Sequence, residues 1–137
     1  MDNTLNNMEE ILDHQICGFR QYVLTSPVHL NYVSSNLCEM LGVRPNALLD
    51  DRTDLYAQMV HPADRERYSD FINRIIVKEQ SLADEYRLVK KDGTIICVRD
   101  TVTTKRLSDG TLIGHSVLAD ITGMINGTFL CFDNKCN

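Results

Sequence analysis

Two Asp-Gly turns divide residues 82–120 into three segments of β-strand pattern, and this arrangement constrains the fold more than any other feature. Asp-Gly is a strong hairpin signal because a tight hairpin turn requires positive φ angles. The first segment alternates apolar and polar side chains, and the other two are rich in β-branched and apolar residues. The pattern predicts a three-stranded antiparallel meander. Its strands are Leu82–Lys90, Ile95–Lys105 and Leu112–Asp120.

A helix is predicted to begin at Pro62, since proline suits the first helical position. Apolar residues then recur at helical spacing on one face, whereas charged and polar residues occupy the other. The helix should therefore lie on an apolar surface. Its apolar face comprises Tyr68, Phe71, Ile72 and Ile75.

The first half of the chain predicts a hairpin and several short helices. Phe19–Thr25 and Leu30–Val33 are strand-like, and Leu37–Leu41 is a short helix that ends at Gly42. Residues 3–16 carry an apolar stripe at helical spacing. We expect an α+β fold, with one five-stranded antiparallel sheet, helices packed on one face, and an N-terminal capping helix.

Charge and hydropathy exclude several classes of protein. The net charge is −5, and residues 1–64 hold nine acidic and three basic residues, so a nucleic-acid partner is not expected. No apolar run is long enough to span a membrane, and the N-terminus lacks the pattern of a signal peptide. We therefore expect a cytoplasmic domain without a membrane span.

No arrangement of residues indicates an enzyme or a metal site. The four histidines are scattered, and nucleotide-binding glycine loops and nucleophile elbows are absent. The five cysteines include no Cys-x-x-Cys pair of the kind that binds zinc. We expect a non-catalytic chain that holds no metal.

Four short motifs in order resemble the PAS (Per-Arnt-Sim) sensor family over residues 18–122. They are Leu30–Asn36 followed by Leu41-Gly42, His61–Arg65, Glu85–Arg87 followed by Lys91–Gly93, and Asp120–Thr122. The resemblance implies a sensory domain at residues 18–122, preceded by an amphipathic helix at 1–17. Residues 123–137 are expected to be a linker or the start of a following domain, so that the chain is a fragment of a longer sensor.

The resemblance also suggests which cofactors to expect. Haem-binding relatives carry the iron ligand within the long helix, and no histidine lies between Pro62 and Lys78. Relatives with a flavin-reactive cysteine carry it before that helix, and none lies between Arg52 and Val60. His61 is better explained as a helix cap than as a ligand. No cofactor is expected, neither haem nor covalent flavin, and the partner should be a small organic metabolite.

The resemblance implies a cavity between the sheet and the helices, and strand alternation indicates which side chains face it. The alternative is a solid core. Asp100 would be costly on the inner face without a partner such as Tyr68, Tyr86, water or a ligand. In a slipped register it would instead face solvent near Arg87 or Lys105. The predicted ligand-binding residues are Met40, Met59, Tyr68, Phe71, Ile72, Ile75, Tyr86, Leu88, Val98 and Asp100.

Two further sets of residues are predicted to transmit a signal. Asp120 and Thr122 would hold the exit of the last strand, by a salt bridge or a hydrogen bond, although an ordinary solvated pair is the alternative. The apolar stripe of the N-terminal helix would contact a second copy in a homodimer. This stripe comprises Leu5, Met8, Leu12 and Ile16.

The function expected from the resemblance is that of a sensory input domain in a bacterial signal-transduction protein, such as a two-component system. A bound metabolite would signal to a kinase or cyclase output domain in the same polypeptide. The alternative is a ligand-free PAS module that mediates dimerisation or protein–protein interaction. A roomy interior would favour the first function, and a close-packed interior would favour the second.

Overall fold

The predicted meander is present in the computed structural model, which describes residues 17–25, 28–50 and 52–123. Its strands are β3 (Leu82–Val89), β4 (Ile95–Arg106) and β5 (Leu112–Asp120). Gly93 and Gly110 adopt φ angles of 91° and 92°, the left-handed values that the two turns require. The sequence prediction was correct because each turn is encoded locally.

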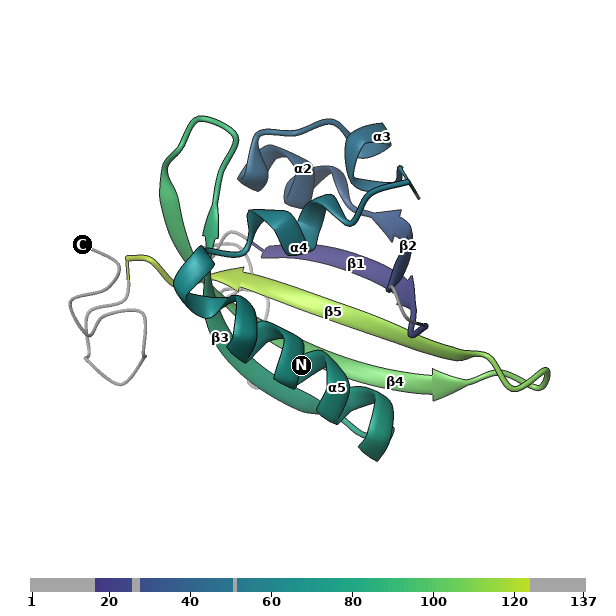
Figure 1. Cartoon of the computed structure of the whole chain (residues 1–137). Coiled ribbons are helices and arrows are strands. Elements are labelled where there is room, and N and C mark those ends of the chain that lie inside the picture. Colours follow the sequence, from purple (N-terminus) through teal and green to yellow (C-terminus); the bar gives the residue numbers. More distant parts are fainter. Residues whose placement is uncertain (1–16, 26–27, 51, 124–137) are drawn as a thin grey trace, which may run out of the picture.

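Two strands from the start of the described chain complete the sheet. β1 (Cys17–Val23) pairs with β2 (His29–Val33) in a hairpin, and it also pairs antiparallel with β5. The strand order is β2-β1-β5-β4-β3, so β5 lies at the centre (Figure 1). Strand β5, the last strand of the described residues, thus joins the two hairpins into the expected five-stranded antiparallel sheet.

Short helices connect the two hairpins. They are α2 (Ser35–Leu41), α3 (Pro45–Leu48) and α4 (Leu55–Met59). The Ser34 hydroxyl accepts a hydrogen bond from the Leu37 amide at 3.2 Å and so caps α2, which ends at Gly42 with φ 73°. Asp54 caps α4 in the same way, through the Ala57 amide.

The long helix is preceded by a tighter turn than the sequence indicated. Pro62–Asp64 forms a 3₁₀ turn, η1, and α5 then runs over Arg65–Lys78. The His61 ring nitrogen Nδ1 accepts a hydrogen bond from the Ala63 amide at 3.1 Å. This contact confirms the capping interpretation of His61.

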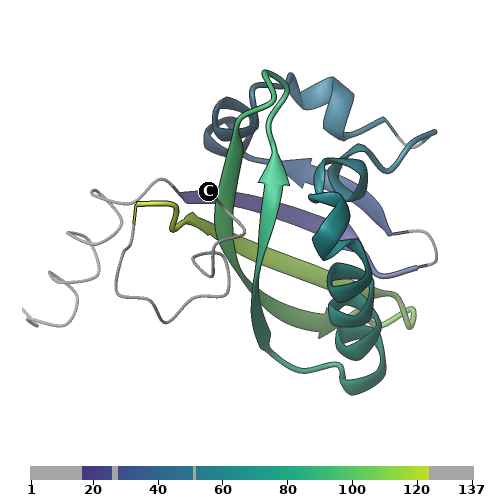
Figure 2. The same cartoon turned by 60° about the vertical axis from the view of Figure 1, so that its left-hand side comes forward.

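The described helices cover one face of the sheet (Figure 2). Helix α2 lies so close to β1 that a Cβ added at Gly18 would be 2.7 Å from Leu37 Cβ. The apolar face of α5 is buried as predicted, and the core lies between this helical layer and the sheet. This interior layer is where the functional residues were expected.

Some predictions concern parts of the chain that lie outside the described residues. These are the N-terminal helix with its stripe Leu5, Met8, Leu12 and Ile16, and the segment after Gly123. No helix in the described part of the chain is both long enough and apolar enough to cross a membrane.

Candidate functional site

A buried ion pair lies in the interior between the sheet and the helices. Arg20 of β1 and Asp100 of β4 both point toward the helices, and Arg20 Nη2 is 3.0 Å from Asp100 Oδ2. Their side chains are 1% and 0% exposed. A charge in such a place is tolerated only when it is paired, so each residue depends on the other.

Tyrosine hydroxyls extend this pair into a network. Arg20 Nη1 donates to the Tyr68 hydroxyl at 3.1 Å, and the Tyr86 hydroxyl donates to Asp100 Oδ2 at 2.8 Å. The Tyr56 hydroxyl lies 2.6 Å from that of Tyr86. Because the single proton of Tyr86 goes to the carboxylate, Tyr56 must donate to Tyr86. The hydrogen bonds therefore run in one direction toward Asp100.

Aromatic rings surround the guanidinium. Arg20 Cζ lies 3.8 Å from the ring centroid of Tyr56 and 4.6 Å from that of Tyr22, which are favourable cation–π distances. The Tyr22 ring lies over Gly114, where an added Cβ would be 2.5 Å from it, and its hydroxyl is 2.8 Å from Ser116 Oγ. A glycine at this position in β5 gives the ring its space.

The network fixes the protonation states of its members. Burial raises the pKa of Tyr56, Tyr68 and Tyr86 above the ordinary tyrosine value, so all three stay neutral. Burial by itself lowers the pKa of Arg20, but the surrounding tyrosines and Asp100 outweigh it and raise the pKa overall. Arg20 is therefore a permanent cation in the interior.

Two polar atoms of the ion pair are left without a hydrogen-bond partner. They are Arg20 Nε, a donor, and Asp100 Oδ1, an acceptor, and both are buried. An unsatisfied buried group of this kind costs free energy. The pair therefore offers one donor and one acceptor to a further molecule, and its own charges sum to zero.

The structure brings the predicted ligand-binding residues together in this interior. All ten are buried, and Asp100 faces inward, so the solvent-facing register was wrong. Of the partners considered for Asp100, Tyr86 contacts it directly and Tyr68 contacts it through Arg20.

Sequence reasoning missed Arg20 itself. The available signal was the need of an inward-facing Asp100 for a cation on the same face, because strand parity alone does not place Arg20.

A groove of about 300 Å³ outside this interior is bordered by Tyr68 and Ile72 of α5. Thr25 and Val28 of the β1–β2 connection and Asp54 before α4 form other parts of its wall. The Tyr68 side chain lines this groove, and its hydroxyl also accepts the hydrogen bond from Arg20 of the buried ion pair. This side chain therefore separates the groove from the buried ion pair.

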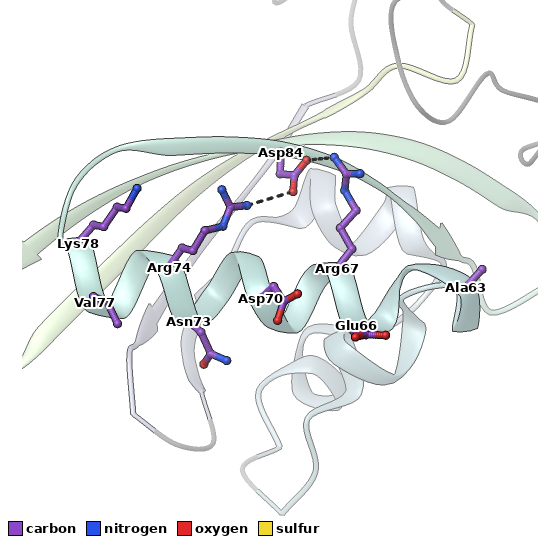
Figure 3. Close-up of a pocket in the computed structure, with 9 residues that line it drawn as sticks. All are labelled: Ala63, Glu66, Arg67, Asp70, Asn73, Arg74, Val77, Lys78 and Asp84. Atoms are coloured by element: carbon purple, nitrogen blue, oxygen red, sulfur yellow. Dashed lines mark hydrogen bonds and ion pairs between the residues drawn. The ribbon is translucent and has the colours of Figure 1, made fainter.

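A second groove runs along the outer face of α5, but its character is different. Figure 3 shows Arg67 and Arg74 reaching from α5 toward Asp84 of β3, with Arg74 Nη2 at 3.5 Å from Asp84 Oδ2. Glu66 and Asp70 lie on the same helix. These ion pairs fasten α5 to the edge strand of the sheet, and the groove contains none of the predicted ligand-binding residues.

Comparison with known families identifies the fold. The sequence profile described as the PAS fold matches residues 30–116. The chain belongs to the PAS family. A search of curated proteins finds no match to this sequence.

Solved structures of PAS domains share this architecture at low sequence identity. The N-terminal domain of a diguanylate cyclase with a PAS/PAC sensor from Marinobacter aquaeolei superposes with a TM-score of 0.66 at 20% identity, covering 77% of this chain and 95% of that one. A domain of a putative light and redox sensing histidine kinase from Haloarcula marismortui gives 0.67 at 17% identity, covering 85% and 99%. The PAS domain of the fruit-fly ELK potassium channel gives 0.58 at 13%, covering 88% and 99%. These likenesses establish the fold.

The His-Pro motif of this PAS domain links α5 to the sheet through Asp64. The Asp64 carboxylate accepts three hydrogen bonds from Arg87 of β3, from the amide at 2.9 Å, from Nε at 2.8 Å and from Nη2 at 2.7 Å. Partial burial opposes ionisation of Asp64, but these bonds outweigh it and lower its pKa. The His61 amide also donates to the Arg87 carbonyl at 2.9 Å.

The Asp-Ile-Thr motif closes the PAS domain by a hydrogen-bonded turn. Thr122 Oγ1 accepts from the Cys97 amide of β4 at 2.8 Å and donates to Asp120 Oδ1 at 2.6 Å. Asp120 Oδ1 also accepts from the Thr122 amide at 3.0 Å. Of the two contacts considered for this motif, the Thr122 hydrogen bond is the one that the structure contains.

Proposed function

We propose that this PAS domain is the sensory input part of a signal-transduction protein and binds a small neutral organic molecule at the Arg20–Asp100 pair. The observation that carries the proposal is the pair of buried atoms without partners, Arg20 Nε and Asp100 Oδ1. An apolar enclosure with a few convergent polar groups is what a small-molecule site requires. Two of the similar structures come from a diguanylate cyclase and a putative sensor kinase, which supports a sensory role.

The chemistry of the pair defines the ligand class. A ligand group that accepts from Arg20 Nε and donates to Asp100 Oδ1 satisfies both atoms. A net charge on the ligand would unbalance a pair that already sums to zero, and burying an uncompensated charge is costly. Amides, lactams and nitrogen heterocycles carry a donor and an acceptor side by side and are neutral. Neither haem nor covalent flavin belongs to this proposal, and their absence stays a prediction.

Tyr68 is the side chain that admits the ligand. It separates the 300 Å³ groove from the ion pair, and it is attached to the pair by one hydrogen bond to Arg20. Rotation of the Tyr68 ring would open the groove toward Arg20. The ligand would then reach Arg20 Nε and Asp100 Oδ1 within the buried network.

Strand β4 offers a route from the ligand to the end of the domain. Asp100 lies opposite Leu118 of β5, and β5 ends at the Asp120–Thr122 turn that is bonded to Cys97 of β4. A ligand shifts this arrangement only if it binds two conformations with different affinity. We propose that movement of β4 against β5 changes the Thr122 hydrogen bond and so signals to an output domain.

Thermal denaturation with small probes tests the proposal. The probes are 2-pyrrolidone, uracil and nicotinamide, and the comparison variant is Arg20→Met/Asp100→Leu, which replaces the pair by apolar side chains of similar size. A ligand that binds only the folded state raises the Tm of the wild type. We expect the double variant to lose this response. Equal stabilisation of both proteins by a probe would contradict the assignment of the site.

The second candidate function is a ligand-free interaction module, and one observation favours it. Phe19 of β1 and Val117 of β5 lie directly opposite each other on the sheet face away from the described helices. Their exposed fractions are 42% and 40%. In this case buried water would satisfy the ion pair, and the sheet face would contact a second copy.

The position of the dimer interface tests this candidate, because a homodimer is also expected for a sensory domain. If the sheet face forms a homodimer, Phe19→Lys should convert a dimer to a monomer in sedimentation velocity. The matched control is Val77→Lys, since Val77 is 80% exposed on α5. A dimer that survives Phe19→Lys would exclude the Phe19–Val117 face as its interface.

A further inference from the structure

A third groove lies between α3, α4 and the β3–β4 hairpin and has a volume of about 500 Å³. These elements stand at the same end of the molecule in both views (Figures 1 and 2). This volume falls within the range of small-molecule sites. The lining residues are Val43, Arg44, Asn46, Ala47, Leu55, Gln58, Met59, Val89, Lys90 and Lys91.

One wall of the groove is apolar, and its side chains remain partly exposed to solvent. Val43, Ala47, Leu55 and Val89 are each only partly buried, and Met59 is 7% exposed. Val60 forms an isolated bridge with Leu88, which places the end of α4 beside β3. The short helix α3 and the hairpin leave this apolar surface open to solvent.

Three cations border the same groove, and no acidic residue lines it. Lys91 is held there by its amide, which donates to the Leu41 carbonyl at 3.2 Å. Within the described residues, Arg44, Lys90 and Lys91 form no ion pair, whereas seven other basic residues do. The nearest acid on the hairpin is Asp92, whose carboxylate accepts from the Thr94 amide and whose pKa Lys90 helps to lower.

We propose that this groove is a second binding site and takes a small amphipathic carboxylate. The apolar body of the ligand would cover Val43, Leu55 and Val89, and its carboxylate would lie among the three cations. Charge complementarity favours an anion because the groove is locally positive in a chain of net charge −5. The apolar wall favours an amphiphile over a simple inorganic anion, since burial of apolar surface supplies part of the affinity.

This site is independent of the proposed interior site. The groove contains neither Arg20 nor Asp100, and Met59 is the only predicted ligand-binding residue that lines it. The two sites are lined by different residues, so their ligands can be distinguished by where they perturb the protein. Failure of one proposal does not decide the other.

Amide chemical-shift mapping with octanoate tests the proposal directly. Octanoate should shift the amides of Ala47, Leu55 and Lys90, whereas 1-octanol and sodium acetate at the same concentration should shift them much less. Equal shifts with 1-octanol would show an apolar surface without selection for an anion and would overturn the proposal. Octanoate shifts confined to Arg20, Tyr68 and Asp100 would assign the carboxylate to the interior and would also overturn it.

Variants add a second criterion. Arg44→Gln/Lys91→Gln should weaken octanoate binding about tenfold, because two exposed charge contacts are lost. The matched control is Lys78→Gln/Lys105→Gln, which removes two lysines outside the groove and should leave the affinity unchanged. Ala47→Glu, which places an acid in the groove, should abolish the octanoate shifts. Equal weakening by both double variants would mean that only the net charge matters and would overturn the site.

Discussion

Arg20 and Asp100 form an ion pair across β5, the central strand of the sheet, with Nη2 and Oδ2 3.0 Å apart. The two residues come from β1 and β4, which are not neighbours in the sheet. Both carry their charges inside the layer where the described helices meet the sheet. The pair therefore connects the two hairpins of the domain through the core as well as through the backbone of β5.

Removal of one partner should destabilise the domain strongly. Asp100→Ala leaves Arg20 charged and buried without its carboxylate, which should lower the free energy of unfolding by about 3–5 kcal/mol. Arg20→Met/Asp100→Leu removes both charges and should recover much of this loss. Urea denaturation of the two variants measures the difference. A loss below about 1 kcal/mol for Asp100→Ala would show that the pair does not matter for stability.

The buried tyrosines should ionise only when the domain unfolds. Burial raises the pKa of Tyr22, Tyr56, Tyr68 and Tyr86. Their contribution to stability is therefore complete below the unfolded pKa of about 10 and is lost as the pH rises through the folded values. In a Tyr32→Phe background, where only these four tyrosines are present, tyrosinate absorbance should rise together with the loss of circular dichroism. An earlier rise, in the folded protein, would contradict this account.

The Asp64–Arg87 contact should make the domain sensitive to acid. The hydrogen bonds from Arg87 lower the pKa of Asp64. The stabilisation is present above the unfolded pKa of about 4 and is lost as the pH falls through the lower folded pKa. Asp64→Asn should therefore flatten the dependence of stability on pH below pH 4. Asp70→Asn, an exposed change on α5, is the control, and equal flattening by both variants would remove Asp64 as the cause.

Gly18 should not tolerate a side chain. An alanine Cβ would be 2.7 Å from Leu37 Cβ and 2.9 Å from Leu37 Cα, so α2 would have to move away from β1. We expect Gly18→Ala to lower the free energy of unfolding by about 1–3 kcal/mol. Gly123→Ala is the matched control, because nothing lies within 4 Å of its added Cβ. Equal stability of the two variants would show that α2 does not pack this closely.

The Thr122 hydroxyl should protect the Cys97 amide from exchange. Thr122→Val removes the acceptor at 2.8 Å, whereas Thr122→Ser keeps it. Hydrogen exchange at Cys97 should become faster in the valine variant and stay slow in the serine variant. Comparable exchange in both variants would argue against the hydroxyl as the group that holds the end of β5.

Local signals in the sequence were sufficient to predict most of the fold. The two Asp-Gly turns lie at the ends of β3, β4 and β5, and counting from them gave the inward parity of Asp100 as one of two possible registers, the one that the structure contains. The capping role of His61 was equally predictable from the sequence, because a cap contacts its own helix. These features depend on neighbours in the sequence.

The partner of Asp100 depends on contacts distant in the sequence. Arg20 meets Asp100 only because β1 pairs with β5, a pairing that no local signal encodes. In the first strand, Phe19 and Val23 alternate with Tyr22 and Leu24, so apolar residues lie on both faces and parity alone does not choose. An acidic residue that faces the core, such as Asp100, requires a cation on the same face of the sheet. This requirement is what could have predicted Arg20 from the sequence.

Native mass spectrometry of the domain, purified without denaturation, tests the central claim most directly. We predict that the wild type retains a small neutral molecule. The Arg20→Met/Asp100→Leu variant, shown to be folded by circular dichroism, should have only the mass of the polypeptide. A wild type that has only the polypeptide mass, or a variant that retains the same molecule, would contradict the assignment of the Arg20–Asp100 pair as the ligand site.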